Sequence, residues 1–354
     1  MGAPSRAGDR WITPSRNHTG TVHETRKNVR NKTLSVSYTS TAPTAAAAPG
    51  GPLAYPASMD APPEAATELR HSPEPRPLVA VLGRRGVLSA DTPILRADDL
   101  GVLRGDGVFE TMDVRAGAPW LLDEHLTRMV SSAESSDLDL PPRKALADLA
   151  AQTCAAWDPA VEGALRLVCT RGPERGGPVT CYATVGPIPP TTLRARREGI
   201  RVATATLGFA ADVRSRSPWL LGGVKSLSYA VNMASQRWAV GQGLDDVLWL
   251  SSDGYALEAP TSTLVWLSGT ELWTVPTTTG ILPGTTARYL LDHAADFGWQ
   301  AGTKLVRPEE LTSADGVWLT SSVRGLAPVR ALDGRELTWS EHTRAVRELL
   351  GYPI

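Results

Sequence analysis

The residue best placed to do chemistry is Lys225, which follows Gly222-Gly223 and precedes an amphipathic run. The chain holds only five lysines among its 36 Lys and Arg residues, so arginine supplies most of its positive charge. A lysine can lose its proton, whereas an arginine cannot. Because the two glycines mark an element boundary, the Lys225 amine can reach into a cleft and act as a base or nucleophile. A solvated lysine at a helix start is the alternative that this local pattern leaves open.

Glu258 is a second candidate, because it stands among small residues between the apolar runs 247–250 and 264–267. A carboxylate in that position is expected to be partly buried and to need a cationic partner. A bound cationic group could be that partner, and an arginine of the chain could serve equally well.

Two hydroxyl-rich segments could bind an anion. Residues 280–286 form a glycine-bounded loop that enters a predicted helix, where free N–H groups, the helix dipole and the hydroxyls of Thr285 and Thr286 favour a negative charge. Residues 320–322 add further hydroxyls at the end of a predicted strand. Ordinary helix capping explains the first segment equally well when it is taken alone.

Composition narrows the class of protein. A chain of 354 residues is long enough for two domains, and a net charge of −1 gives no field that would attract nucleic acid or an anionic membrane. No apolar run approaches the roughly 18 residues of a membrane span. Cys154, Cys169 and Cys181 lack metal-ligand spacing, and their odd number predicts no disulfide framework and a reducing compartment. We therefore expect a cytoplasmic protein without a structural metal.

The predicted elements that position these residues alternate between strands and helices. Residues 1–75 are rich in Thr, Ser, Ala, Pro and Gly, which predicts a disordered tail to which we assign no function. A break at 186–190 predicts a boundary between a small α+β domain, 76–190, and a larger one, 191–354. Asp123 is the predicted N-cap of the first long helix. Strands are expected at 77–82, 108–114, 163–170, 179–185, 201–207, 247–250, 264–267 and 272–276, and helices at 121–136, 143–157, after Lys225 to about 241, 287–297 and 340–350.

Taken in order, these segments resemble the class IV, or fold type IV, pyridoxal-phosphate enzymes, which include branched-chain aminotransferases, D-amino-acid aminotransferases and aminodeoxychorismate lyase. The resemblance covers roughly residues 77 to 350. It rests on Gly105-Asp106-Gly107-Val108-Phe109-Glu110, Glu124-His125-Leu126-Thr127-Arg128-Met129, Lys225, Glu258, and Leu282-Pro283-Gly284-Thr285-Thr286.

The resemblance implies a role for each matching residue. Lys225 would form the Schiff base with pyridoxal phosphate, and Glu258 would pair with the pyridine nitrogen and keep the ring an electron sink. The remaining cofactor-binding residues would hold the phosphate: Arg128, Leu282, Thr285, Thr286 and Ser322. The family implies two α+β domains with the cofactor in the cleft between them, and usually a homodimer in which the partner's loops reach the site.

Within the family, the segments are most similar to aminodeoxychorismate lyase. The loop 171–177 keeps Arg175 but lacks the histidine of D-amino-acid enzymes, and Ala230 stands where branched-chain enzymes usually have Tyr. Thr263 departs from the Asn that many members carry five residues after the Glu. The resemblance therefore implies conversion of 4-amino-4-deoxychorismate to 4-aminobenzoate and pyruvate in folate biosynthesis.

That substrate carries two carboxylates, so we expect Arg324 and Arg175 to bind it together with Phe109. Each arginine could instead be a solvated loop residue. Two alternatives to the lyase remain. One is a class IV aminotransferase acting on branched-chain or D-amino acids with a 2-oxo acid acceptor, and the other is a cofactor-binding protein without activity.

Overall fold

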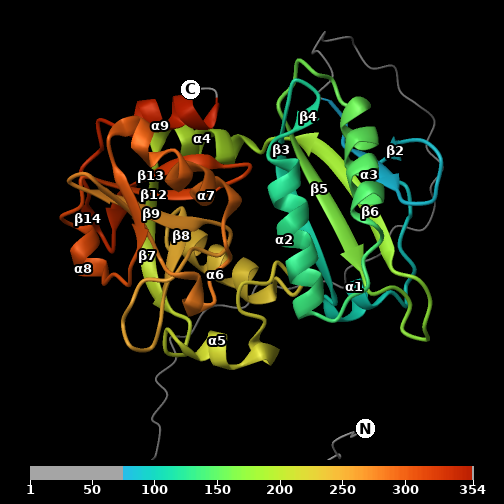
Figure 1. Ribbon diagram of the computed structural model, residues 1–354, viewed down its shortest axis with the longest axis horizontal. Helices are drawn as coiled ribbons and strands as arrows, with labels where there is room; N and C mark the ends of the chain where they lie inside the picture. The colour runs from blue at the N-terminus through green and yellow to red at the C-terminus, as the bar shows by residue number, and fades with distance from the viewer. Residues whose placement is uncertain (1–74, 353–354) are drawn as a thin grey trace, which may run out of the picture. The chain divides into compact units, whose positions relative to one another are not determined.

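The computed structural model describes residues 75–352, and its strands form two separate sheets (Figure 1). The predicted α+β class is therefore confirmed. The predicted tail, 1–75, lies almost wholly outside the described residues. Within residues 75–352, no helix combines the length and the apolar character that crossing a membrane requires.

The first sheet has six antiparallel strands in the order β2-β1-β6-β5-β3-β4. Two long helices, α2 and α3, pack against it over a core of aliphatic side chains that includes Met112 and Leu165. The elements of this half are β1 (Leu78–Val81), β2 (Leu88–Ser89), α1 (Leu100–Arg104), β3 (Gly107–Arg115), β4 (Ala118–Pro119), α2 (Leu122–Ser135), α3 (Arg143–Ala155), β5 (Gly163–Thr170) and β6 (Thr180–Pro187).

Helix α2 differs from its prediction at its start and along its buried face. Leu121, in the left-handed region with φ of 54°, precedes the helix, and no side chain caps it. The prediction of Asp123 as N-cap is therefore wrong, and Asp123 lies in the first turn. Leu126 and Met129 are buried as their spacing predicts, but His125 and Arg128 are buried too. A buried polar face of this kind indicates that the helix contacts more than an apolar core.

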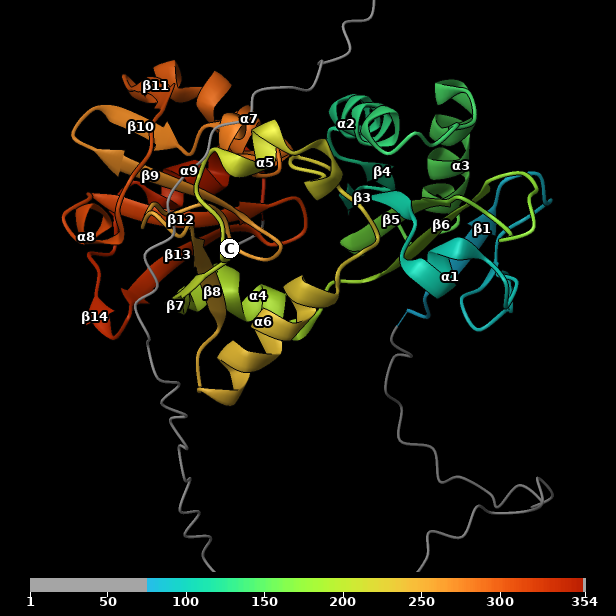
Figure 2. The same cartoon turned by 90° about the horizontal axis from the view of Figure 1, so that it is seen from below.

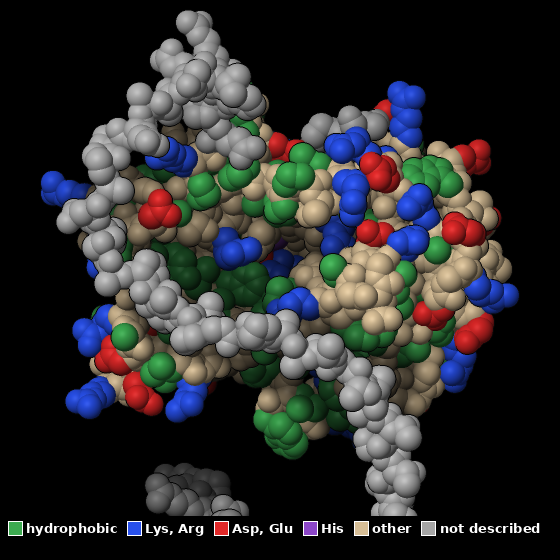
Figure 3. Space-filling model, turned by 180° about the vertical axis from the view of Figure 1, so that it is seen from behind, with side chains coloured by type: hydrophobic (Ala, Val, Ile, Leu, Met, Phe, Trp, Pro, Cys, Tyr) green, Lys and Arg blue, Asp and Glu red, His purple; other side chains and the backbone are tan. Residues whose placement is uncertain are grey.

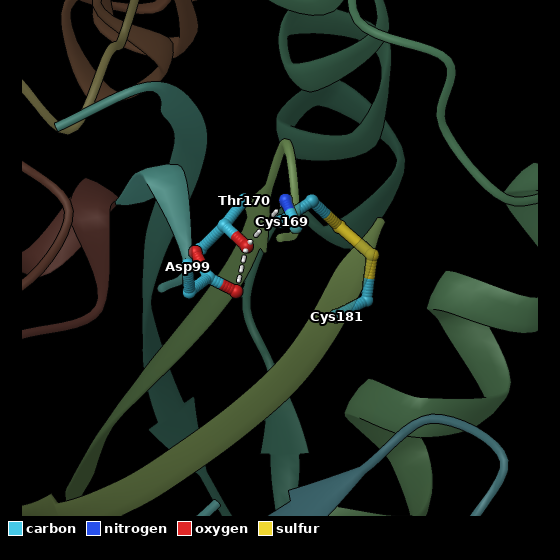
Figure 4. The surroundings of a disulfide bond; sticks show 5 residues. Asp99, Cys169, Thr170 and Cys181 are labelled. Atoms are coloured by element: carbon cyan, nitrogen blue, oxygen red, sulfur yellow. Dashed lines mark hydrogen bonds between the residues drawn. A yellow bond between two sulfur atoms is a disulfide. The ribbon is translucent and has the colours of Figure 1, made fainter. Parts of the chain in front are cut away.

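Cys169 and Cys181 form a disulfide (Figure 4). They are directly paired in the register of β5 and β6, with Cα atoms 4.3 Å apart. The prediction of no disulfide is therefore wrong, because strand pairing brings together two cysteines whose sequence spacing alone shows no pattern. Next to them, the Thr170 hydroxyl donates to Asp99 Oδ2 at 2.9 Å, which fixes the start of the 171–179 loop.

The second sheet has eight strands, seven of them in the order β11-β10-β9-β12-β13-β7-β8, and β14 pairs with β13. Helices α6 and α7 lie on opposite sides of it (Figure 2). Its strands are β7 (Ile200–Thr206), β8 (Asp246–Leu250), β9 (Thr263–Ser268), β10 (Glu271–Thr274), β11 (Gln300–Thr303), β12 (Gly316–Ser321), β13 (Gly325–Leu332) and β14 (Arg335–Glu336). Its helices are α4 (Pro190–Glu198), α5 (Val213–Arg216), α6 (Ala230–Gly241), α7 (Thr285–Asp292), α8 (Pro308–Leu311) and α9 (Thr343–Leu350), with short 3-10 turns at Pro218–Leu220, Thr277–Thr279 and Ala294–Phe297.

Most predicted elements of this half are present, with shifted ends. Helix α4 was not predicted and begins within the proline-rich break. The domain boundary near residue 190 stays a prediction, since β6 ends at Pro187 and β7 begins at Ile200. Helix α6 was expected to begin just after Lys225 but begins at Ala230. The structure leaves its apolar residues Val231 and Trp238 61% and 48% exposed.

Candidate active site

Lys225 is held by backbone contacts with the first half of the chain. Its N–H donates to Ser132 Oγ at 3.1 Å, and its carbonyl accepts from Phe109 N at 3.0 Å. The residues before it pack closely, because a Cβ at Gly222 would lie 3.1 Å from Gly280 Cα. The Nζ atom lies 4.5 Å from the Phe109 ring centroid. The backbone of Lys225 is therefore held in place by hydrogen bonds, and Lys225 is not a solvated residue at a helix start.

The Lys225 amine has an unusual acidity for a lysine. Burial, and then the positive charge of Arg128, lower its pKa to about 8, while Glu110 and Glu258 oppose the change. About a tenth of the amine is therefore neutral at about pH 7, and this neutral fraction, which a lysine needs to act as nucleophile or base, grows as the pH rises toward 8.

Glu258 lies in the connection between β8 and β9 and is buried. Its Oε2 accepts from the backbone N–H of Leu282 at 3.0 Å, and Arg214 Nη1 lies 3.7 Å from Oε1. Burial raises the pKa of Glu258 to about 7, although the Leu282 N–H and Arg214 act in the opposite direction. The sequence left two cationic partners open for Glu258, an arginine or a bound group. The structure has room for either, because Arg214 is near and the carboxylate also lines a cavity.

The predicted anion-binding residues come together at the start of α7. Gly284 precedes this helix without a side-chain cap, so the N–H groups of the first turn are available. Thr285 Oγ1 and Ser322 Oγ lie 3.3 Å apart, although 37 residues separate them. Arg128 donates through Nη1 to Pro283 O at 2.9 Å. The loop, the strand end and helix α2 therefore form one group of hydrogen-bond donors.

Two residues that sequence reasoning did not single out complete this group. Glu110 accepts hydrogen bonds from Arg128 Nε at 2.8 Å and from Arg128 Nη2 at 2.6 Å. His125 Nδ1 lies 2.7 Å from Glu110 Oε2. On its other side, His125 Nε2 lies 3.2 Å from Thr285 Oγ1 and 3.1 Å from Ser322 Oγ. Both belong to quoted motifs, and a signal existed: a charged residue inside an apolar strand, and a histidine three positions from Arg128 on one helix face.

The charge states of this group follow from burial and pairing. Burial alone would raise the pKa of Glu110, but the charge and hydrogen bonds of Arg128 outweigh it and lower the pKa to about 2. Burial, with the charges of Arg128 and Lys225, lowers the pKa of His125 despite the nearby Glu110. Glu110 is therefore a carboxylate and His125 is neutral at ordinary pH.

Lys225, Glu258 and the donors at the start of α7 line one cavity of about 700 Å³, whereas Glu110 and His125 are not among its lining residues. On the face in Figure 3, hydrophobic and basic side chains gather around a hollow. The predicted site residues that line the cavity are Lys225, Glu258, Arg128, Leu282, Thr285, Thr286, Ser322, Phe109 and Arg324. Only Arg175 of the predicted set is not among the lining residues, and it is exposed on the 171–179 loop.

Two arginines of the cavity wall differ in their partners. Arg324 Nη1 donates to the buried Asp246 Oδ2 at 2.6 Å. Arg166, on β5 opposite Thr111, is exposed into the cavity and forms no salt bridge with any described residue. Sequence reasoning did not single out Arg166, because a basic residue in a strand is usually a solvated one.

Comparison with known proteins identifies the arrangement. The sequence model of the family described as "Amino-transferase class IV" matches residues 107–332. The chain belongs to the class IV aminotransferase family. It is 40% identical over 278 residues to a bifunctional aminodeoxychorismate lyase / D-amino acid transaminase of Mycobacterium tuberculosis, covering 76% of this chain and 96% of that protein.

Solved structures agree with this class IV assignment. A hypothetical aminotransferase from Mycobacterium tuberculosis in its PLP-bound form has a TM-score of 0.73 and 40% identity, covering 78% of this chain and 97% of that one. The 4-amino-4-deoxychorismate lyase of Pseudomonas aeruginosa has a TM-score of 0.65 and 28% identity, covering 77% and 98%. The fold-type-IV architecture is confirmed, and the chain is an enzyme that uses pyridoxal phosphate.

The described residues of this class IV enzyme fit that cofactor. A cradle of uncapped N–H groups, two facing hydroxyls and an anchored arginine suits a phosphate dianion. At the other side, Glu258 suits a protonated ring nitrogen, and Lys225 suits the aldehyde carbon. When bound, pyridoxal phosphate supplies an electron sink for a carbanion beside the substrate nitrogen.

Proposed function

We propose that this enzyme is an aminodeoxychorismate lyase, which converts 4-amino-4-deoxychorismate to 4-aminobenzoate and pyruvate in folate biosynthesis. The observation that carries the proposal is the basic lining of the cavity, which includes Arg166 and Arg324 together with Lys225. A substrate with two carboxylates needs two cationic contacts, and guanidinium groups bind carboxylates well. The printed activities of the Mycobacterium tuberculosis and Pseudomonas aeruginosa proteins support it.

Lys225 has the central role in the proposed reaction. Its neutral amine takes the proton from the amine-bearing ring carbon of the substrate, and the resulting ammonium returns a proton as the enolpyruvyl group leaves. Loss of that group makes the ring aromatic, which drives the step. A pKa of about 8 suits both directions of transfer near neutral pH.

The substrate contacts are proposed as follows. Arg166 is unpaired among the described residues and binds one carboxylate directly, while Arg324 binds the other and remains tied to Asp246. Phe109, beside Lys225 Nζ, forms the apolar wall on which the ring of the substrate packs. Replacing Arg324 by Ala is expected to raise KM for the dianionic substrate and also to leave Asp246 buried and unpaired.

A homodimer is the second part of the proposal. Apolar side chains of α6 and the turn before it, Trp219, Val231, Trp238 and Val240, are 48% to 77% exposed. Val231 and Trp238 are seven positions apart and so share one face of α6. Apolar side chains exposed together on one face are typical of a protein interface. Arg175 enters the proposal through this dimer, in which its loop would reach the partner's cavity. Light scattering of the purified chain tests the dimer, and Arg175→Ala should raise KM only if the dimer forms.

A class IV aminotransferase acting on D-amino acids, or on branched-chain amino acids, is the second candidate. The printed name of the Mycobacterium tuberculosis relative includes both activities, and D-alanine aminotransferase of Bacillus licheniformis is 28% identical over 246 residues. Transamination must pass through the pyridoxamine form of the cofactor, whereas the lyase need not. A cytoplasmic location also remains a proposal, and the disulfide removes the cysteine argument for it.

The test is an absorbance spectrum of the purified holoenzyme, followed by product analysis. With 4-amino-4-deoxychorismate, the lyase should release 4-aminobenzoate while the protein-bound cofactor band is retained. Conversion of the band to the pyridoxamine form by a D- or branched-chain amino acid, reversed by a 2-oxo acid and without 4-aminobenzoate, would show an aminotransferase and overturn the lyase proposal.

A further inference from the structure

His125 lies beside the phosphate cradle, and its ring nitrogens make four side-chain contacts. The longest of them, 3.4 Å between Arg128 Nη2 and Nδ1, is too long to compete with the other contact of that nitrogen. His125 is completely buried on α2, with Nδ1 2.7 Å from Glu110 Oε2 and Nε2 within 3.2 Å of two hydroxyls, those of Thr285 and Ser322. Because every polar atom of the ring has a partner, its proton position is fixed by those partners rather than by water.

The tautomer follows from the neighbours. Glu110 also accepts two hydrogen bonds from Arg128, so it is an ionised carboxylate that has no proton to give. His125 Nδ1 must therefore donate to it. In the neutral imidazole Nε2 then carries a lone pair and can accept a hydrogen bond but not donate one.

This lone pair limits what the two hydroxyls can do. Thr285 and Ser322 both lie within hydrogen-bond distance of Nε2, but a single lone pair accepts only one of their protons well. The hydroxyls are 3.3 Å apart and both line the cavity. The second hydroxyl can donate to the first across this 3.3 Å or turn its proton into the cavity. A phosphate dianion in the cavity accepts hydrogen bonds and donates none, so it favours the second orientation.

We infer that His125 is a positioning residue for the phosphate of the cofactor: with Glu110 as its anchor, it takes one hydroxyl proton of the Thr285–Ser322 pair and directs the other toward the phosphate. Glu110 thereby organises the cradle twice, once through Arg128 and once through His125. The inference rests on pyridoxal phosphate as cofactor and not on the choice between lyase and aminotransferase.

The test compares two ligands that differ only in the phosphate. Cofactor-free full-length protein is titrated with pyridoxal phosphate and with pyridoxal. The dissociation constant for pyridoxal divided by that for pyridoxal phosphate measures what the phosphate contributes to binding. His125→Asn keeps a donor for Glu110 but has no acceptor at the Nε2 position. This variant should lower the ratio by about tenfold, the size of a hydrogen bond to a charged group.

Matched variants separate positioning from folding. His125→Gln keeps an acceptor near the Nε2 position and should lower the ratio less than His125→Asn. In a Thr285→Val/Ser322→Ala background, His125→Asn should cause no further loss, since no hydroxyl remains to be oriented. His342→Asn, at a half-buried histidine that does not line the cavity, is the control and should leave both affinities unchanged.

A second measurement uses the wild-type protein, so it does not depend on whether a His125 variant folds. Nitrogen NMR of histidine-labelled wild-type holoenzyme should show one imidazole as the neutral tautomer protonated at Nδ1. A ring protonated at Nε2, or at both nitrogens, as the only buried histidine signal would overturn the inference. So would equal losses of affinity for pyridoxal and pyridoxal phosphate in His125→Asn. Failure of the wild type to bind pyridoxal phosphate at all would instead contradict the cofactor assignment.

Discussion

The two ends of the cavity are built in different ways. At the phosphate end, Glu110 and His125 are completely buried, Arg128 is almost so, and these three side chains are hydrogen-bonded to one another. In the rest of the lining, which we call the open end, Arg166 is exposed without a salt bridge to any described residue, and Trp219 is 77% exposed. The phosphate end is thus preorganised, whereas the open end keeps an exposed cation and an exposed apolar side chain.

Removing Lys225 should have the largest effect, because the proposed reaction uses this residue in both of its proton transfers. Lys225→Ala is expected to reduce turnover by about 10³-fold or more, since both proton transfers lose their base and acid. Initial rates and the absorbance spectrum measure this. Lys304→Ala, which removes a lysine stacked on Trp273 outside the cavity, is the control. A Lys225→Ala enzyme with near-normal turnover would remove Lys225 from the mechanism.

Removing Arg128 should destabilise the phosphate end of the cavity. Arg128→Ala leaves the Glu110 carboxylate buried with only a neutral histidine, which is expected to lower the free energy of unfolding by about 3–5 kcal/mol. Urea denaturation of the cofactor-free protein measures the change. Arg143→Ala breaks an exposed ion pair with Asp123 and should cost at most about 1 kcal/mol. Equal losses in the two variants would show that the Glu110–Arg128 pair has no special importance.

Removing Arg166 should affect only the open end. Arg166→Ala is expected to raise KM for 4-amino-4-deoxychorismate by about tenfold or more, because a hydrogen-bonded carboxylate contact is lost. The affinity for pyridoxal phosphate should stay unchanged. Steady-state kinetics and cofactor titration measure both quantities, and Arg197→Ala, an exposed residue away from the cavity, is the control. An unchanged KM would assign the carboxylate to other residues.

The smallest effect expected is a pH dependence from Lys225. Since burial and Arg128 lower its pKa to about 8, the neutral fraction rises with pH through that value. The rate at which cofactor-free protein takes up pyridoxal phosphate should therefore increase about threefold between about pH 7.5 and pH 8.5. Stopped-flow absorbance measures this rate. A rate that stays flat up to about pH 10 would contradict the lowered pKa.

Elements with strong local patterns could be predicted from the sequence. The largely apolar run of β3 and the Leu126–Met129 spacing of α2 give the correct element types, because such patterns depend on local geometry. The start of α6 at Ala230 could not be predicted. Residues 225–227 instead contact β3, through Lys225 O to Phe109 N and Leu227 N to Gly107 O, and no local signal encodes a partner more than a hundred residues away.

Side-chain partners show the same division. The spacing Glu124 to Met129 indicates which helix carries Arg128, but not that Glu110, on another element, holds it with two hydrogen bonds. Likewise, twelve residues of separation say nothing about Cys169 and Cys181, which become neighbours only through the register of β5 and β6.

The sequence by itself was enough to predict the cofactor of this protein, because pyridoxal-phosphate chemistry needs particular residue types in a particular order: a lysine, a carboxylate, an arginine on a helix and a hydroxyl-bearing helix start. Only the tertiary structure decided how these groups are oriented and charged. His125 became a partner of Thr285 and Ser322, Arg324 became tied to Asp246, and Lys225 acquired a pKa of about 8. Those properties depend on burial and on distances of a few ångströms between distant segments, which composition and spacing do not contain.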